Sequence, residues 1–223
     1  TPKTSSAASD VYKRQKLGLE LDSNLEKDIT SLSHLLNEIP SGRNYEETLK
    51  MFLTGNSEEI LDEMQKYKLT KYLIPITNDY LKSKKDKRFI KVALRNTDER
   101  YKANKTLTPS FLFSVLLWPA FFKRIDAIKS NKMKLSKINN ISNVILKKHS
   151  AKCFLPKHIQ NSIKEIWELQ ILLMRIPEKS KIALRRRLFR AGYDFLLLRE
   201  KSGENVTKVS QWWSHRVNNA KKR

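Results

Sequence analysis

The sequence is poor in the residues that build disulfides, tight turns and zinc clusters. Its 223 residues include one cysteine, Cys153, five glycines and seven prolines. A single cysteine excludes an internal disulfide and a zinc site made of several thiolates, and it suits a reducing, intracellular compartment. So few glycines and prolines argue against a loop-rich β protein, a collagen or a low-complexity linker.

Long apolar runs are also missing. The longest, residues 111–122, has twelve mostly apolar residues, whereas a membrane-spanning helix needs about twenty. This run therefore predicts a buried core helix. The N-terminus carries no apolar segment of the kind found in signal peptides. We predict a soluble protein of the cytoplasm.

Common catalytic signatures are absent as well: there is no GxGxxG, P-loop, HExxH or GxSxG. His149 and Cys153 are four residues apart and could share a helix face. A metal needs three or four ligands, and His34, His158 and His215 are not placed to complete a site. A nucleophilic pair would need an activating third group, which nothing suggests. We predict a partly buried, structural pair, no catalytic or metal-binding residue, and no activity of this chain alone.

Helical periodicity runs through almost the whole sequence. Apolar residues at three- and four-residue spacing, as in residues 25–39, indicate amphipathic helices, and Pro40 ends the first of them. Thr108 and Pro109 supply an N-cap hydroxyl and a proline at the first helical position, and Pro119 predicts a kink. No strand alternation lasts long enough to indicate a sheet. The predicted fold class is all-α, an irregular multi-helix arrangement with short loops.

Composition shifts divide the chain. Residues 1–15 have no apolar period and are rich in Ser, Thr and Ala, which predicts a disordered leader. Asn56, with Glu59 three residues later, resembles a capping box that opens a helix. Residues 130–140 are polar and Asn-rich and predict a loop that serves as a hinge. We therefore expect a leader at 1–15, a helical domain at 16–130 and a basic helical domain at 131–223.

Positive charge is concentrated in the second half of the chain. The formal net charge is +22 at pH 7, of which residues 129–223 carry +17 and residues 1–128 carry +5. The like charges in such a surplus repel one another unless a polyanion lies against them. Nucleic acid is favoured over an anionic membrane surface, because no long basic stretch has the Trp/Phe/Leu face of an interfacial helix.

The basic residues form three runs, which predict a phosphate-binding surface. Residues 185–187, with Lys181 and Arg190, are predicted to place cations around most of one helix, and a second cluster lies near a helix end at residues 147–157. A solvated face usually explains one charge run, but three runs in one half favour phosphate contacts that release counterions. The candidate residues for stacking on single-stranded bases are Tyr193, Trp212 and Trp213, although at least one tryptophan is expected to pack in the core.

Seven segments resemble bacterial poly(A) polymerases, which share the nucleotidyltransferase superfamily with the tRNA CCA-adding enzymes. They are KLGLEL (16–21), SLSHLLNEIPSGRNYEETLKMFLTGN (from 31), LRNTDERY (94–101), TPSFLFSVLLWP (108–119), IWELQ (166–170), FRAGYDFLLLR (189–199) and QWW (211–213). The resemblance runs in order over about residues 16–213, and its later motifs favour poly(A) polymerase over the CCA-adding branch. It implies the C-terminal neck and RNA-binding body of such an enzyme.

Residues 1–15 depart from the family pattern. The segment SSAASDVYKRQ looks like a translation of sequencing-adapter read-through. Our hypothesis is that the native sequence starts near Lys16 and that the N-terminal catalytic head is missing. In the parent enzyme, the resemblance implies, that head uses ATP and Mg²⁺ to add poly(A) to RNA 3′ ends in mRNA processing and decay. This segment is expected to need no cofactor.

The resemblance and the charge pattern together imply RNA as the partner, held at its 3′ end through backbone contacts. The candidate RNA-binding residues are Arg43, Lys50, Arg95, Arg100, Lys147, Lys148, Lys181, Arg185, Arg186, Arg187 and Arg190. Two alternatives stay open. One is a protein-interaction module that docks an RNA helicase or other RNA-decay factors, and the other is a fragment of a tRNA CCA-adding enzyme.

Overall fold

The computed structural model describes residues 23–128 and 135–221, and it contains helices and no strand in these ranges. The predicted all-α class is confirmed. The leader at 1–15 and residues 130–134 of the predicted loop lie outside the described residues. None of the described helices combines the length and the apolar character needed to cross a membrane.

The described elements follow one another with short connections. In chain order they are α2 (Ser23–Leu32), the 3-10 helix η1 (Ser33–Glu38), α3 (Ser41–Phe52), α4 (Ser57–Lys66), α5 (Thr70–Leu73), α6 (Pro75–Tyr80), α7 (Lys84–Lys102), α8 (Pro109–Leu116), α9 (Trp118–Asp126), α10 (Leu135–Ser150), α11 (Lys157–Leu173), α12 (Ser180–Leu184), α13 (Phe189–Lys201) and α14 (Thr207–Lys221).

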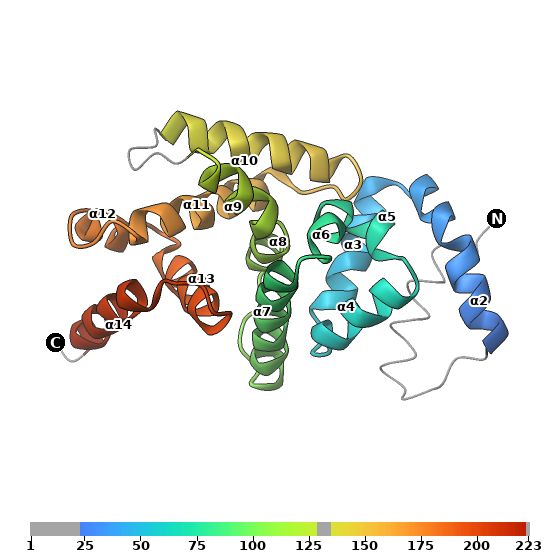
Figure 1. Ribbon diagram of the computed structural model, residues 1–223, viewed down its shortest axis with the longest axis horizontal. Helices are drawn as coiled ribbons and strands as arrows, with labels where there is room; N and C mark the ends of the chain where they lie inside the picture. Colours follow the sequence, from blue (N-terminus) through green and yellow to red (C-terminus); the bar gives the residue numbers. More distant parts are fainter. Residues whose placement is uncertain (1–22, 129–134, 222–223) are drawn as a thin grey trace.

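The helices form an elongated assembly with α7 and α8 near its middle (Figure 1). Helices α2–α6 lie on one side of this centre and α12–α14 on the other. Helix α11 packs against both α8 and α13, α4 packs against α7, and α10 packs against α9. The second half of the chain is therefore joined to the first where α11 packs against α8, α10 against α9 and α13 against α7.

Most helix ends lie close to the predicted positions. The Thr108 hydroxyl accepts a hydrogen bond from the backbone N–H of Phe111 (3.4 Å), which confirms the predicted N-cap. Helix α8 ends before Pro119 and α9 begins at Trp118, so this proline opens a separate helix instead of kinking one. Its ring removes a backbone donor, which the first turn of a helix does not need.

Two other sequence predictions are wrong. Residues 135–140 belong to α10 and not to a loop, because Ile138 and Ile145 of this helix are buried at helical spacing. The Asn56 side chain makes no capping hydrogen bond. Instead, the carboxylate of Asp98 on α7 accepts hydrogen bonds from the backbone N–H groups of Ser57 (2.7 Å) and Glu58 (3.1 Å). Helix α4 is therefore capped from another helix.

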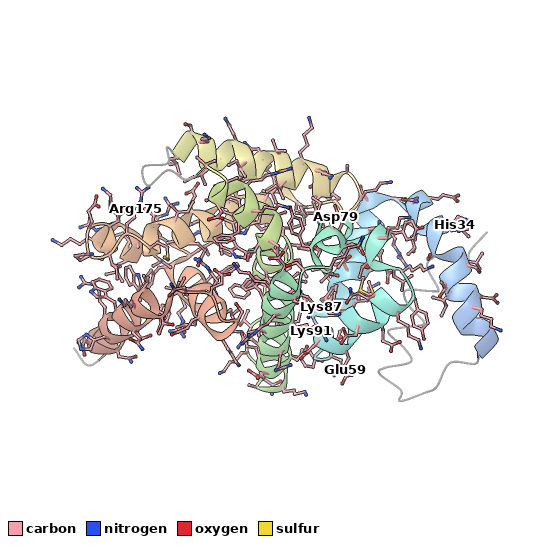
Figure 2. All side chains as sticks on the ribbon, viewed as in Figure 1. His34, Glu59, Asp79, Lys87, Lys91 and Arg175 are labelled. Carbon is pink, nitrogen blue, oxygen red and sulfur yellow. The ribbon has the colours of Figure 1, made fainter. Side chains whose placement is uncertain are left out.

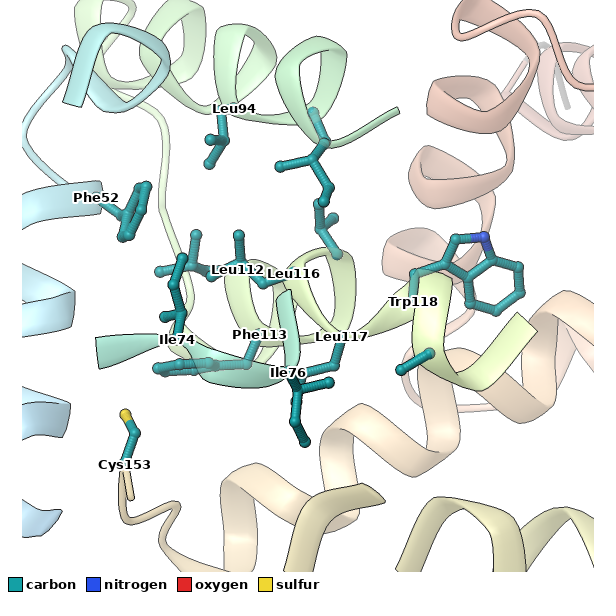
Figure 3. Close-up of a cluster of buried hydrophobic side chains, with 14 of the residues drawn as sticks. Phe52, Ile74, Ile76, Leu94, Leu112, Phe113, Leu116, Leu117, Trp118 and Cys153 are labelled. Atoms are coloured by element: carbon teal, nitrogen blue, oxygen red, sulfur yellow. The ribbon is translucent and has the colours of Figure 1, made fainter. Parts of the chain in front are cut away.

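The main hydrophobic core is centred on α8 (Figure 3). Leu112, Phe113, Leu116 and Leu117 are at most 2% exposed, and burying a side chain of this size contributes about 1.5–3 kcal/mol. Ile163 and Trp167 of α11 belong to the same cluster, as do residues of α3, α4 and α7. The core is thus continuous across residue 130, where the sequence predicts a domain boundary.

A second, smaller cluster lies between the end of α11 and helices α12–α14. The indole N–H of Trp213 donates to the carbonyl of Leu173 (3.0 Å). At Gly192 of α13 the helices approach closely, because a Cβ there would lie 2.8 Å from the Cβ of Leu169. Gln170 donates to the Gly192 carbonyl (2.8 Å). This cluster fixes the start of α13 and the basic segment before it.

Candidate nucleic-acid interface

The arginine run at residues 185–187 lies in a turn between α12 and α13. Arg185 caps the end of α12, and α13 starts at Phe189; we call residues 185–188 the arginine turn. The predicted helix with cations on most sides is therefore wrong for these arginines. The backbone N–H of Leu188 donates to a carboxylate oxygen of Glu165 on α11 (3.2 Å), and this tertiary bond helps to hold the non-helical segment.

The three arginines of the turn differ in their surroundings. Arg186 bonds to the carboxylate of Glu168 and lies 3.9 Å from that of Glu165, with its side chain 36% exposed. Arg187 is 75% exposed and lies 3.9 Å from the other Glu165 oxygen. Arg185 and Lys181 are exposed, and neither has a carboxylate partner among residues 23–128 and 135–221. Arg186 therefore anchors the turn, while Arg185, Arg187 and Lys181 face solvent.

Two further candidate arginines approach the turn from neighbouring helices. Arg190 of α13 pairs with Asp194 (3.0 Å) and lies over the ring of Tyr193. Arg100 of α7 donates to the carbonyl of Thr106 (3.0 Å). Together with Arg187 they line one cavity. The fold thus brings together three candidates from two distant parts of the sequence.

A second basic surface lies at the end of α10. Lys147 and Lys148 are exposed in its last turn. The segment after it packs against the start of α3, where the N–H of Phe154 donates to the carbonyl of Ser41 (2.9 Å). This contact places the end of α10 beside the helix that carries Arg43. Figure 1 shows α3 and α12 on opposite sides of α8, so this surface is separate from the arginine turn.

The candidates on α3, and Arg95 on α7, are paired with carboxylates. Arg43 and Lys50 both contact Glu47, at 3.0 and 3.4 Å. Arg95 donates two hydrogen bonds of 2.8 Å to Glu58, and this bonding holds the pKa of Glu58 below its ordinary value. The side chains of these three cations are 47–57% exposed, so phosphates can reach them, although Glu47 itself is buried.

Pairing is general along this flank of α7. Lys87 and Lys91 both pair with Asp62 of α4, and Figure 2 labels them on the side of α7 that faces α4. The carboxylates of the first half therefore neutralise much of its positive charge. Both halves keep exposed cations with no carboxylate partner among the described residues, for example Lys84 and Lys105 in the first half and Lys147 and Lys148 in the second.

The aromatic candidates are mostly buried. Trp213 is fully buried and Tyr193 is 7% exposed, with its hydroxyl 2.8 Å from that of Ser214. Base stacking on these two rings is therefore a wrong prediction, since both rings are buried in the second core cluster. Trp212 is half-buried beneath the guanidinium of Arg216, 5.4 Å from the ring. Stacking on Trp212 stays a prediction.

His149 and Cys153 are more deeply buried than predicted. Burial lowers the pKa of His149 to about 4 and raises the pKa of the Cys153 thiol to about 12. The thiol therefore stays protonated at neutral pH, and the thiolate needed for nucleophilic attack is not formed. In the described part of the chain, no group of three or more His, Cys, Asp and Glu side chains is placed to hold a metal ion.

The sequence analysis missed one buried cation, Arg199. Its guanidinium lies 5.0 Å from the ring of Trp118 and 5.7 Å from that of Phe122. It donates to Glu204 at 2.9 Å and to Gln170 at 3.4 Å. The sequence gives only a weak signal for this buried pair, because an arginine five residues before a glutamate is a common pattern. Arg199 is a structural residue that lines a cavity of about 860 Å³.

Comparison with known proteins gives two matching family models. Residues 131–223 match the model described as "Polymerase A arginine-rich C-terminus", and residues 18–81 match "Probable RNA and SrmB- binding site of polymerase A". Similar curated proteins are Poly(A) polymerase I of Salmonella typhimurium, 28% identical over 207 residues, and of Haemophilus influenzae, 29% identical over 209 residues. Both alignments cover 89% of this chain, but only 44% and 45% of the relatives.

Proposed function

The chain belongs to the family of the bacterial poly(A) polymerases, and from this membership we propose that it holds the RNA strand for an RNA 3′-adenylyltransferase. The parent reaction would join AMP from ATP to an RNA 3′ hydroxyl without a template. The single observation that carries the role of this chain is the arginine turn, which presents cations to solvent in the segment matched by the arginine-rich model.

The proposed binding does not depend on the base sequence of the RNA. Arg185, Arg187 and Lys181 would contact phosphates, which carry no base information. Each contact releases condensed counterions, so affinity falls steeply as salt rises. Lys147 and Lys148 would supply a second set of contacts at the end of α10. Such recognition suits a substrate whose 3′ ends differ in sequence.

ATP and Mg²⁺ belong to the proposed parent reaction. The described residues offer no set of three ligating side chains for a metal ion, and the sequence contains no P-loop. The residues present therefore do not fit these groups, and no step involving them is assigned to this chain. Its proposed contribution is to bind and orient RNA, in the cytoplasm that its single buried cysteine suits.

The test separates the anchoring arginine from the exposed ones. Arg185→Ala together with Arg187→Ala should lower the slope of log affinity against log salt by about 1–1.5, since each single-strand phosphate contact contributes about 0.7. Arg186→Ala, the matched control, should lower the melting temperature and leave the slope nearly unchanged. Titration of labelled RNA at several salt concentrations, beside melting curves, measures both quantities. An unchanged slope in the double variant would remove the arginine turn from the RNA surface.

A protein-docking function is the second candidate. The description of the model that matches residues 18–81 names SrmB beside RNA, and several cations of this half are paired with carboxylates. Docking of a helicase or another RNA-decay factor would survive high salt, whereas RNA binding would not. A CCA-adding function would instead appear as a preference for tRNA over unstructured RNA.

A further inference from the structure

A cavity of about 280 Å³ lies between the C-terminal half of α7, the first turn of α8 and the first turns of α13. It is formed by residues about 90 positions apart in the sequence, and three of the segments that resemble the family, at 94–101, 108–119 and 189–199, contribute to its lining. The segment 106–108 closes it on one side and Arg187 and Leu188 of the arginine turn on the other. The cavity therefore joins the two halves of the chain at the proposed RNA surface.

The chemistry of the lining is divided. The apolar part includes Leu53, Leu107, Phe111 and Leu188, and the charged part is Arg100, Arg187 and Arg190 together with the carboxylate of Asp194, which pairs with Arg190. Apolar walls suit the faces of a planar base, and guanidinium groups match phosphate oxygens in a bidentate way. Few ligands other than a nucleotide combine a flat apolar ring with a phosphate.

Two features add to this complementarity. The amide of Asn96 lines the cavity and makes no hydrogen bond with another described residue, so its donor and acceptor are available to a base edge. Helices α8 and α13 both begin at the cavity, with Thr108 and Leu188 as their N-caps. The positive ends of two helix dipoles therefore add to the field of the arginines.

We propose that this cavity receives one nucleotide of the bound RNA, with its base against the apolar wall and its phosphate against Arg100, Arg187 and Arg190. The proposal rests on the proposed function, because it names a subsite of the same RNA surface. The volume is near the lower limit of ligand pockets, about 300 Å³, which suits one nucleotide and not a folded strand. The rest of the strand would lie along the exposed cations of the arginine turn.

The first test changes the cavity and keeps its arginines. Asn96→Asp places a carboxylate where the nucleotide would lie, and we expect it to weaken binding of an oligoadenylate of about 15 nucleotides by about tenfold. The control Asn218→Asp makes the same change of charge at an exposed position of α14 and should weaken binding less than about threefold. Ala191→Phe fills the cavity, and Ala127→Phe is its control at an exposed position.

The second test locates the base directly. A single 8-azidoadenosine in the same oligonucleotide should crosslink, on irradiation of the full chain, to peptides that contain Leu107 and Phe111 or residues 187–194. Mass spectrometry of the digest identifies these peptides. If Ala191→Phe fails to fold, as shown by its melting curve, Asn96→Asp and the crosslink decide the outcome.

The outcomes distinguish the subsite from the function. If the unaltered chain binds no RNA, the proposed function fails and the subsite with it. If the chain binds RNA but both cavity variants behave like their controls, or the crosslinks fall elsewhere, the subsite is overturned and the function stands. Loss of binding in Asn96→Asp together with crosslinks to the cavity peptides would support the proposal.

Discussion

His149 illustrates how one buried side chain links stability to pH. Its ring packs edge-on against Phe113, with ring centroids 5.4 Å apart, and neither ring nitrogen has a hydrogen-bond partner in the described parts of the chain. Burial lowers its pKa from 6.5 to about 4. Between these values the unfolded chain binds a proton that the folded chain does not. The free energy of unfolding therefore falls as pH drops from about 6.5 towards about 4, and this group has no effect above that window.

The substitution His149→Leu should remove this dependence of the free energy of unfolding on pH. The histidine destabilises the folded chain by up to about 3 kcal/mol at the acid end of the window, and leucine has no proton to bind. Denaturant unfolding at about pH 7 and about pH 5 measures the difference. His158→Leu, at an exposed position of α11, should keep the dependence of the unaltered chain. If the free energy of unfolding of His149→Leu still fell between about pH 7 and about pH 5 as much as that of the unaltered chain, the pH dependence would come from other groups.

At the scale of elements, the capping of α4 from α7 replaces a local device by a tertiary one. The Asp98 carboxylate accepts from the Ser57 N–H, the Glu58 N–H and the Ser57 hydroxyl. We expect Asp98→Ala to lower the free energy of unfolding by about 2–3 kcal/mol, because it removes a cap and leaves buried donors unpaired. Urea unfolding provides the measurement.

Asn56→Ala is the matched control for this prediction. Asn56 occupies the N-cap position of α4 but makes no side-chain capping bond, so its replacement should change the free energy of unfolding by less than about 0.5 kcal/mol. If Asn56→Ala were the more costly of the two changes, the cap would be local, as the capping-box pattern predicts.

At the scale of the whole molecule, the continuous core implies joint unfolding of the two halves. Ile145 and Leu146 of α10 and Trp167 of α11 belong to the same cluster as α8, so separating the halves would expose this surface. We expect a single calorimetric transition in which the calorimetric and van't Hoff enthalpies agree. Two resolved transitions would show instead that the parts of the chain before and after residue 130 unfold independently.

The sequence alone determined the helical class, most helix positions and the concentration of positive charge. These properties are local: the spacing of apolar residues sets a helix, and a hydroxyl before a proline, as at Thr108, marks its start. The charge surplus needs only a count, and it already pointed to a polyanion. The resemblance of the motifs supplied the family.

Only the tertiary structure decided which of these residues are available for binding. Trp212 and Trp213 are neighbours in the sequence, but only Trp213 is fully buried, because its side chain packs against α11. Arg185 and Arg186 are equally adjacent, yet Arg186 bonds to Glu168, 18 residues away. Asp98 caps a helix 41 residues before it. Such partners meet through the packing of distant helices, and local periodicity contains no information about that packing.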